Sequence, residues 1–187
     1  MRKTVPICAA LLLACLPVRA QRTSYGERLA TADILCSFSS LGVSASLGYY
    51  LLDGYWAGEL SAVVRATRVA ETGEPLGYAR VTGGAAWMYR LWSTRSRDIC
   101  AYAGGDLFMG FESMDPFGAL EEGTRAGLLN SGYSRTRFIY GPALRAEAEW
   151  FVRDALALTV PVRMPVTLNS AFGTLGFEAG VGIRYNF

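Results

Sequence analysis

The sequence predicts an all-β fold, an eight-stranded antiparallel up-and-down β-barrel of the outer-membrane type. Residues Phe177 to Phe187 alternate apolar and polar side chains and end on an aromatic residue, which is typical of a strand with one apolar face. Further alternating stretches occur between short turns through most of the chain, as in the smallest outer-membrane barrels. The chain also begins with a segment that has the features of an export signal.

The N-terminal segment predicts a signal peptide over residues 1–20. Arg2 and Lys3 precede an apolar run from Val5 to Leu16, and a small-residue cleavage site ends at Ala20. The apolar run is too short to span a bilayer. An alternative is a lipobox that ends at Cys15, which would then be lipidated, but the site at Ala20 is the better match. We expect one barrel domain over residues 21–187.

Charge composition argues against direct nucleic-acid binding. The whole chain has 18 basic and 16 acidic residues, and the signal peptide removes three bases, Arg2, Lys3 and Arg19. The mature chain therefore has no basic surplus to attract phosphates. It also has no Lys, so every base is Arg. Arg without Lys suits charges packed against carboxylates in a confined space rather than a solvated surface.

The first three strands are predicted in residues 28–67. Residues 28–38 form the first and have the least regular alternation. The second, 43–51, has apolar residues at every odd position, and Asp53-Gly54 follows as a tight turn because Gly accepts a positive φ. The third, 56–67, alternates apolar residues with polar ones that include Glu59 and Arg65.

The fourth and fifth strands are predicted at residues 80–91 and 99–112. The fourth alternates apolar residues with Arg80, Thr82 and Arg90, and a turn from Ser93 to Arg97 follows it. The fifth places Asp106 and Glu112 opposite an apolar face. A long polar segment, 113–137, comes next.

The last three strands are predicted at residues 138–150, 156–168 and 177–187. The sixth and seventh are joined at Arg153-Asp154, and residues 169–174 connect the seventh to the eighth. Pro142, Pro161 and Pro165 lie in the sixth and seventh strands. Since Pro cannot donate to a ladder, we expect bulges there; the alternative is a locally weakened seam.

Turn lengths and aromatic residues indicate how the barrel lies in a membrane. Outer-membrane barrels keep their periplasmic turns short, so the long loop at 113–137 should lie on the outer side. One group of apolar-face aromatic residues falls near the periplasmic strand ends, as expected of an interfacial girdle. These residues are Tyr49, Trp56, Trp87, Tyr89, Trp150 and Tyr185. Phe111, Phe138 and Tyr140 should mark the other rim.

Alternation alone leaves open a soluble periplasmic lipid-binding barrel with its apolar face inward. The absence of Lys, the aromatic girdle and the terminal Phe187 favour the apolar face outward, in an outer membrane. In the last strand, Ile183, Tyr185 and Phe187 look like the C-terminal signal read by the barrel-assembly machinery.

The residues that are missing limit the chemistry. The chain has no His, the usual general base near neutral pH, so we expect no enzymatic activity. Cys36 and Cys100 alone do not make a metal site, and we expect both to be free thiols. No cofactor is expected.

The inward face should carry a paired Arg–carboxylate network that fills the lumen, because an eight-stranded barrel is narrow and buried charges need partners. The candidate residues are Glu59, Arg65, Arg80, Asp106, Arg145, Glu147, Glu149, Arg163, Glu178 and Arg184. A pair such as Glu147 and Glu149 could instead suggest acid–base catalysis, but the network is the better interpretation.

The loop at 113–137 is the best candidate for a partner-binding segment, because long loops in compact domains are functional or disordered. Its candidate contact residues are apolar or acidic: Phe117, Glu121, Glu122, Leu128 and Tyr133. A disordered loop without a partner is the alternative.

Several blocks, in this order and spacing, resemble one family, the TraO conjugative transposon transfer proteins of Bacteroides-type bacteria. The blocks are the basic turn at Arg95 and Arg97, Gly110-Phe111-Glu112, residues 137–141, Glu147-Ala148-Glu149 with Phe151 and Asp154, and residues 180–187. The resemblance covers most of the mature chain.

The resemblance implies an outer-membrane component of a conjugative mating apparatus, with a structural or assembly role and no catalytic residues. Its implied partners are outer-membrane lipid and other transfer proteins. A generic small surface or adhesion barrel, and the periplasmic lipid-binding barrel, remain alternatives.

Overall fold

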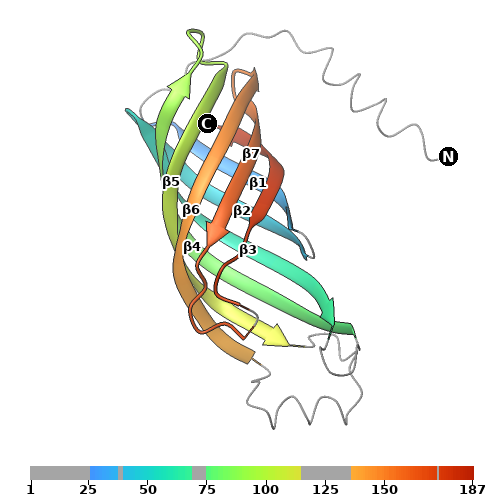
Figure 1. The fold of residues 1–187 in the computed structure, drawn as a ribbon. Helices are drawn as coiled ribbons and strands as arrows, with labels where there is room; N and C mark the ends of the chain where they lie inside the picture. Colours follow the sequence, from blue (N-terminus) through green and yellow to red (C-terminus); the bar gives the residue numbers. More distant parts are fainter. Residues whose placement is uncertain (1–25, 38–39, 69–74, 115–135, 172) are drawn as a thin grey trace, which may run out of the picture.

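The computed structural model describes residues 26–37, 40–68, 75–114, 136–171 and 173–187. Within them, eight strands form a closed antiparallel barrel in which β1 also pairs with β8 (Figure 1). The strands are β1 (Arg28–Ser37), β2 (Ser40–Leu51), β3 (Gly54–Arg68), β4 (Pro75–Ser93), β5 (Ile99–Met114), β6 (Thr136–Arg153), β7 (Leu156–Pro165) and β8 (Glu178–Asn186). The predicted fold class is confirmed. The predicted signal peptide, with Cys15, lies outside the described residues.

The two ends of the barrel differ. The end that we call the turn end has the short connections at 52–53, 94–98 and 154–155, together with the C-terminus (Figure 1). These turns fall within one residue of their predicted positions. The opposite end, the loop end, has an uneven rim because β4 has 19 residues and β6 has 18, whereas β8 has 9.

The strands extend into both ends of the predicted loop at 113–137. Ser113 belongs to β5 and pairs with Thr136 at the start of β6. The alternation in β5 and β6 continues to these residues, so the segment between the strands is shorter than predicted. Residues 115–135, with all five candidate contact residues, lie outside the described part of the chain.

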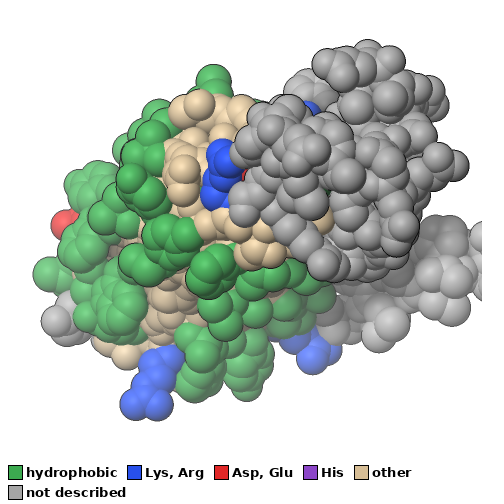
Figure 2. All heavy atoms as spheres, turned by 90° about the horizontal axis from the view of Figure 1, so that it is seen from below, with side chains coloured by type: hydrophobic (Ala, Val, Ile, Leu, Met, Phe, Trp, Pro, Cys, Tyr) green, Lys and Arg blue, Asp and Glu red, His purple; other side chains and the backbone are tan. Residues whose placement is uncertain are grey.

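Apolar side chains cover the outside of the barrel, as Figure 2 shows around its wall. Leu47, Leu107 and Leu144 are each between 66% and 70% exposed. The residues between them on the same strands point inward and are mostly buried. This arrangement is the reverse of a soluble lipid-binding barrel. In the described ranges, no helix has the length and apolar character needed to cross a membrane.

The turn end has the outward-facing aromatic residues predicted for a girdle. Tyr49 packs edge-on against Trp56 with a centroid distance of 4.7 Å, and Trp87, Tyr89, Trp150 and Tyr185 are exposed. Trp92 joins them, because a register shift between Arg90 and Trp92 turns it outward. At the loop end, Phe138 packs against both Phe111 and Tyr140.

The expectation of bulges at the prolines is wrong. β7 pairs with β8 at Thr159↔Gly182 and again at Val162↔Ala179 in unchanged register, so the pairing is interrupted without an inserted residue. Pro161 has no N–H to donate at this point. β7 ends at Pro165, and beyond it Val166 and Leu168 form isolated bridges with Leu175 and Tyr140.

Candidate functional site

Most of the predicted lumen charges form a chain of ion pairs across the middle of the barrel. Its acids and bases alternate in the order Glu59, Arg145, Asp106, Arg163, Glu178 and Arg80, and we call it the mid-lumen chain. These residues come from β3, β6, β5, β7, β8 and β4. Each side chain is at most 9% exposed. The chain therefore ties together six of the eight strands.

The tightest contacts of the mid-lumen chain are at Asp106. Arg163 donates from Nε and Nη2 to the two carboxylate oxygens of Asp106 at 2.9 and 2.7 Å, and Arg145 Nη1 lies 3.7 Å from Oδ2. Arg145 also pairs with Glu59, and Arg80 pairs with Glu178. Because three bases face three acids, the charges of the mid-lumen chain balance, which lowers the cost of burying them.

A second group of charges lies toward the turn end and centres on Arg184. Its guanidinium lies 2.8 Å from Glu147 and 3.2 Å from Glu149, and it donates to the Tyr55 hydroxyl at 3.2 Å. Tyr50 donates to Glu149 at 2.5 Å. Glu147 and Glu149, which the sequence alone could have assigned to acid–base catalysis, therefore bind the same arginine.

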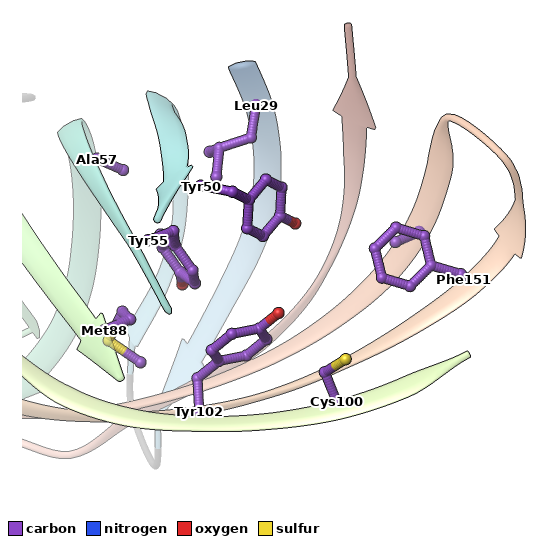
Figure 3. Close-up of a cluster of buried hydrophobic side chains, with 9 residues drawn as sticks. Leu29, Tyr50, Tyr55, Ala57, Met88, Cys100, Tyr102 and Phe151 are labelled. Carbon is purple, nitrogen blue, oxygen red and sulfur yellow. The ribbon is translucent and has the colours of Figure 1, made fainter. Parts of the chain in front are cut away.

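Aromatic and aliphatic side chains close the turn end of the lumen (Figure 3). Tyr55 contacts Tyr50 and Tyr102 with ring centroids 5.9 and 5.2 Å apart. The complete cluster is Leu29, Tyr50, Tyr55, Ala57, Met88, Cys100, Tyr102, Phe151 and Ala157. Together with the mid-lumen chain and the charges around Arg184, this cluster fills the middle and the turn end of the lumen with side chains.

Nearer the loop end, the inward residues make different contacts. Arg65, a predicted lumen charge, places its guanidinium carbon 5.9 Å from the centroid of the Tyr78 ring. Glu112 accepts hydrogen bonds from the Ser170 hydroxyl at 2.7 Å and from the Ala171 N–H at 3.0 Å. Glu112 thereby fastens the segment between β7 and β8 to β5.

Sequence reasoning missed several lumen residues. Asp33 accepts hydrogen bonds from Ser44 at 3.1 Å and from Thr159 at 2.9 Å. The signal for it was present, since Thr31 and Asp33 alternate with apolar residues in β1. Tyr50 and Tyr55 flank the predicted turn at Asp53-Gly54, and their inward positions follow from the same period of two.

The described part of the lumen has little free space at the mid-lumen chain. A cavity beside Glu59, Asp106 and Arg145 has a volume of about 10 Å³, which is about the space that one water needs. No group of three or more His, Cys, Asp or Glu residues that could hold a metal ion occurs among the described residues. Cys36 and Cys100 are free, as predicted.

The residues of the predicted assembly signal lie at the end of β8. Ile183, Tyr185 and Phe187 are between 53% and 57% exposed on the outside of the barrel. Tyr185 stacks on Phe187 with a centroid distance of 6.1 Å. Phe187 exchanges two backbone hydrogen bonds with Arg28, both 3.0 Å long, which joins the end of the chain to β1.

A closed barrel with an apolar wall and a charge-filled lumen belongs to the class of small outer-membrane β-barrels. Solved structures with this fold include Neisserial surface protein A (15% identity, TM-score 0.54, 88% of this chain and 98% of that one). Another is the N-terminal barrel domain of Pseudomonas aeruginosa OprF (12% identity, TM-score 0.53, 87% and 98%). A third is Ail, the attachment invasion locus protein of Yersinia pestis (11% identity, TM-score 0.50, 88% and 100%).

Sequence comparison identifies the family. A search of curated proteins finds no match. Residues 54–187, more than half of the chain, match the family described as conjugative transposon protein TraO, and the chain belongs to this family. The family predicted from the sequence blocks is confirmed.

Proposed function

We propose that this protein is an outer-membrane component of a conjugative transfer apparatus, in which it has a structural or assembly role. Membership of the TraO family is the observation that carries the proposal. The exposed apolar wall supports placement in the outer membrane, since barrels in that membrane present such an apolar band to lipid. In this placement the turn end faces the periplasm and the loop end faces outward.

The filled lumen argues for an anchor rather than a conduit. The mid-lumen chain crosses the barrel, and the aromatic cluster around Tyr55 closes its turn end. A DNA strand or a protein could not pass without breaking these contacts. The sequence has no His, and we propose a role without catalysis and without direct nucleic-acid binding.

We propose that other transfer proteins bind the loop that connects β5 to β6 at the loop end of the barrel. Its sequence combines apolar and acidic residues, Phe117, Glu121, Glu122, Leu128 and Tyr133. Protein partners recognise such mixed segments through apolar anchors surrounded by charges. The rigid barrel would hold this loop at a fixed place on the membrane.

Conjugation frequency tests the proposal. A donor with an in-frame deletion of the gene should transfer far less, and a plasmid copy of the gene should restore transfer. Unchanged transfer in the deletion strain would contradict a transfer role and leave a generic surface or adhesion barrel.

A plasmid copy that lacks residues 115–135 separates the loop from the barrel. We expect this copy to reach normal levels of folded barrel in the outer-membrane fraction, measured by heat-modifiable electrophoresis, without restoring transfer. Full restoration would show that the loop is not the partner-binding segment.

A further inference from the structure

The outer wall of the barrel is hollowed between β2 and β6. A groove of about 630 Å³ lies on this face, with the small residues Ala85 and Gly105 in its floor. Its sides are the large residues Tyr49, Leu51, Trp56, Trp87, Leu107 and Pro142. Trp87 and Leu107 are 61% and 70% exposed on the outside, so this groove, the wall groove, opens away from the lumen.

The wall groove continues to the turn end. A second hollow of about 320 Å³ shares Leu51 and Trp87 with it and is also lined by Leu52, Asp53 and Tyr89. We call this second hollow the rim hollow. Together they form a trough that runs from the β2–β3 turn to the middle of the apolar wall.

We propose that the trough binds one phospholipid with an amine-bearing headgroup. The proposal rests on the membrane placement argued above. Within the hydrocarbon layer no water fills a groove, and an empty one forfeits dispersion contacts along its whole lining. An acyl chain has the apolar surface and the slender shape to occupy the wall groove over Ala85 and Gly105, alongside Trp87.

The rim hollow indicates the headgroup. Asp53 is the only charged residue among the described residues that line it, and it is exposed. Its carboxylate complements an ammonium. The guanidinium of Arg90, which donates to the Leu52 carbonyl oxygen at 2.9 Å, lies beside the same hollow and suits the phosphate of the headgroup. Because the hollow lies at the turn end, the lipid belongs to the leaflet on that side, with its headgroup beside Asp53 and its chain directed toward Leu107.

Tryptophan fluorescence distinguishes a bound lipid from bulk lipid contact. The chain has four Trp residues, so single-Trp variants can retain either Trp87 in the trough or Trp150 on the outside of β6. Both variants are reconstituted in bilayers with a rising fraction of brominated phosphatidylethanolamine. We expect quenching of Trp87 to saturate at a several-fold lower brominated fraction than quenching of Trp150.

Two matched substitutions in the Trp87-only protein test the groove itself. Ala85→Leu fills the floor of the wall groove. The quenching of Trp87 should then depend on the brominated fraction in the same way as the quenching of Trp150. Ala148→Leu adds the same bulk at an exposed position on β6 and should leave the saturation unchanged. If Trp87 follows Trp150 without any substitution, the lipid site is refuted while the membrane placement stands. If neither Trp is quenched, the barrel is not in the bilayer and both proposals fail.

The headgroup is tested with brominated phosphatidylglycerol, which has no amine. We expect the quenching of Trp87 to saturate only at a several-fold higher fraction of this lipid. Asp53→Asn should remove the difference between the two lipids. Equal saturation by both lipids in the unsubstituted Trp87-only protein would overturn the proposed recognition of an amine.

Discussion

Arg163 on β7 binds Asp106 on β5 through two parallel hydrogen bonds of 2.9 and 2.7 Å. The two strands are not neighbours, because β6 lies between them. The guanidinium carbon of Arg163 also lies 4.8 Å from the centroid of the Phe108 ring, and the side chains are 6% and 3% exposed. This contact bridges over β6 on the inner side of the barrel and ties β5 to β7.

Removing one partner should be costly. In Arg163→Met, Asp106 loses its bidentate donor and Glu178 loses one of its two arginines. An uncompensated buried charge typically costs about 3–5 kcal/mol. We expect the free energy of unfolding to fall by this amount in denaturant titrations of the refolded barrel.

The double variant Arg163→Met/Asp106→Leu provides the control. It removes one acid and one base and leaves two complete pairs, Arg145 with Glu59 and Arg80 with Glu178. We expect it to regain most of the lost stability. Arg153→Met, at an exposed position next to the β6–β7 turn, should change stability by less than about 0.5 kcal/mol. A double variant as unstable as Arg163→Met would contradict the paired network.

Close packing of β4 against β5 should make Gly104 intolerant of any side chain. A Cβ at this position would lie 2.0 Å from the carbonyl oxygen of Trp87. Since a backbone atom cannot yield as a side chain can, we expect Gly104→Ala to destabilise the barrel by about 1–3 kcal/mol.

Gly58→Ala is the matched control on β3. The nearest atom to its Cβ would be the carbonyl oxygen of Leu47 at 3.9 Å, so nothing needs to move. We expect stability to stay constant or to rise by up to ~1 kcal/mol, because Ala restricts the unfolded chain. The two unfolding midpoints, measured in the same detergent, check both expectations; equal losses would refute the argument.

The period of two in the sequence was sufficient to predict the strands and to divide their residues between two faces. Together with the absence of Lys, the aromatic girdle and the terminal Phe187, the alternation placed Asp106, Glu147 and Arg184 in the lumen. The alternation predicted no side for Trp92, which lies beyond the predicted strand and faces outward because one extra residue in β4 reverses the alternation. A bulge depends on how two strands pair, so one strand's sequence does not reveal it.

The partners of the lumen charges could not be predicted from the alternation. Glu147 and Glu149 on β6 both bind Arg184 on β8, although β7 lies between the strands. Which acid meets which base depends on the tilt and stagger of the closed barrel. These are properties of the whole ring of strands. Asp33 was missed for a different reason, because Leu29 and Leu35 share the inward face of β1 with Asp33 and obscure the alternation.

Pro161 should weaken the seam between β7 and β8. It keeps its pairing with Glu147 on β6, while the pairing with β8 is lost at residues 160 and 161. The missing N–H therefore belongs to the β8 side. We expect Pro161→Val to restore the ladder and to slow amide hydrogen exchange across residues 179–182. Exchange in this segment that is unchanged, or faster, would show that Pro161 does not limit the seam.

Phe187 should matter more for assembly in the cell than for the stability of the finished barrel. Its contacts with Arg28 are made by backbone atoms, which Phe187→Ala retains, and its side chain is 57% exposed on the wall. We therefore expect the variant to refold in vitro with a nearly normal yield, while its folded fraction in the outer membrane falls severalfold. Heat-modifiable electrophoresis measures both fractions. Phe177→Ala, at the other end of the same outward-facing series and 43% exposed, should lower neither fraction. An equal loss in vitro and in the cell would mean that Phe187 acts through packing rather than through recognition by the assembly machinery.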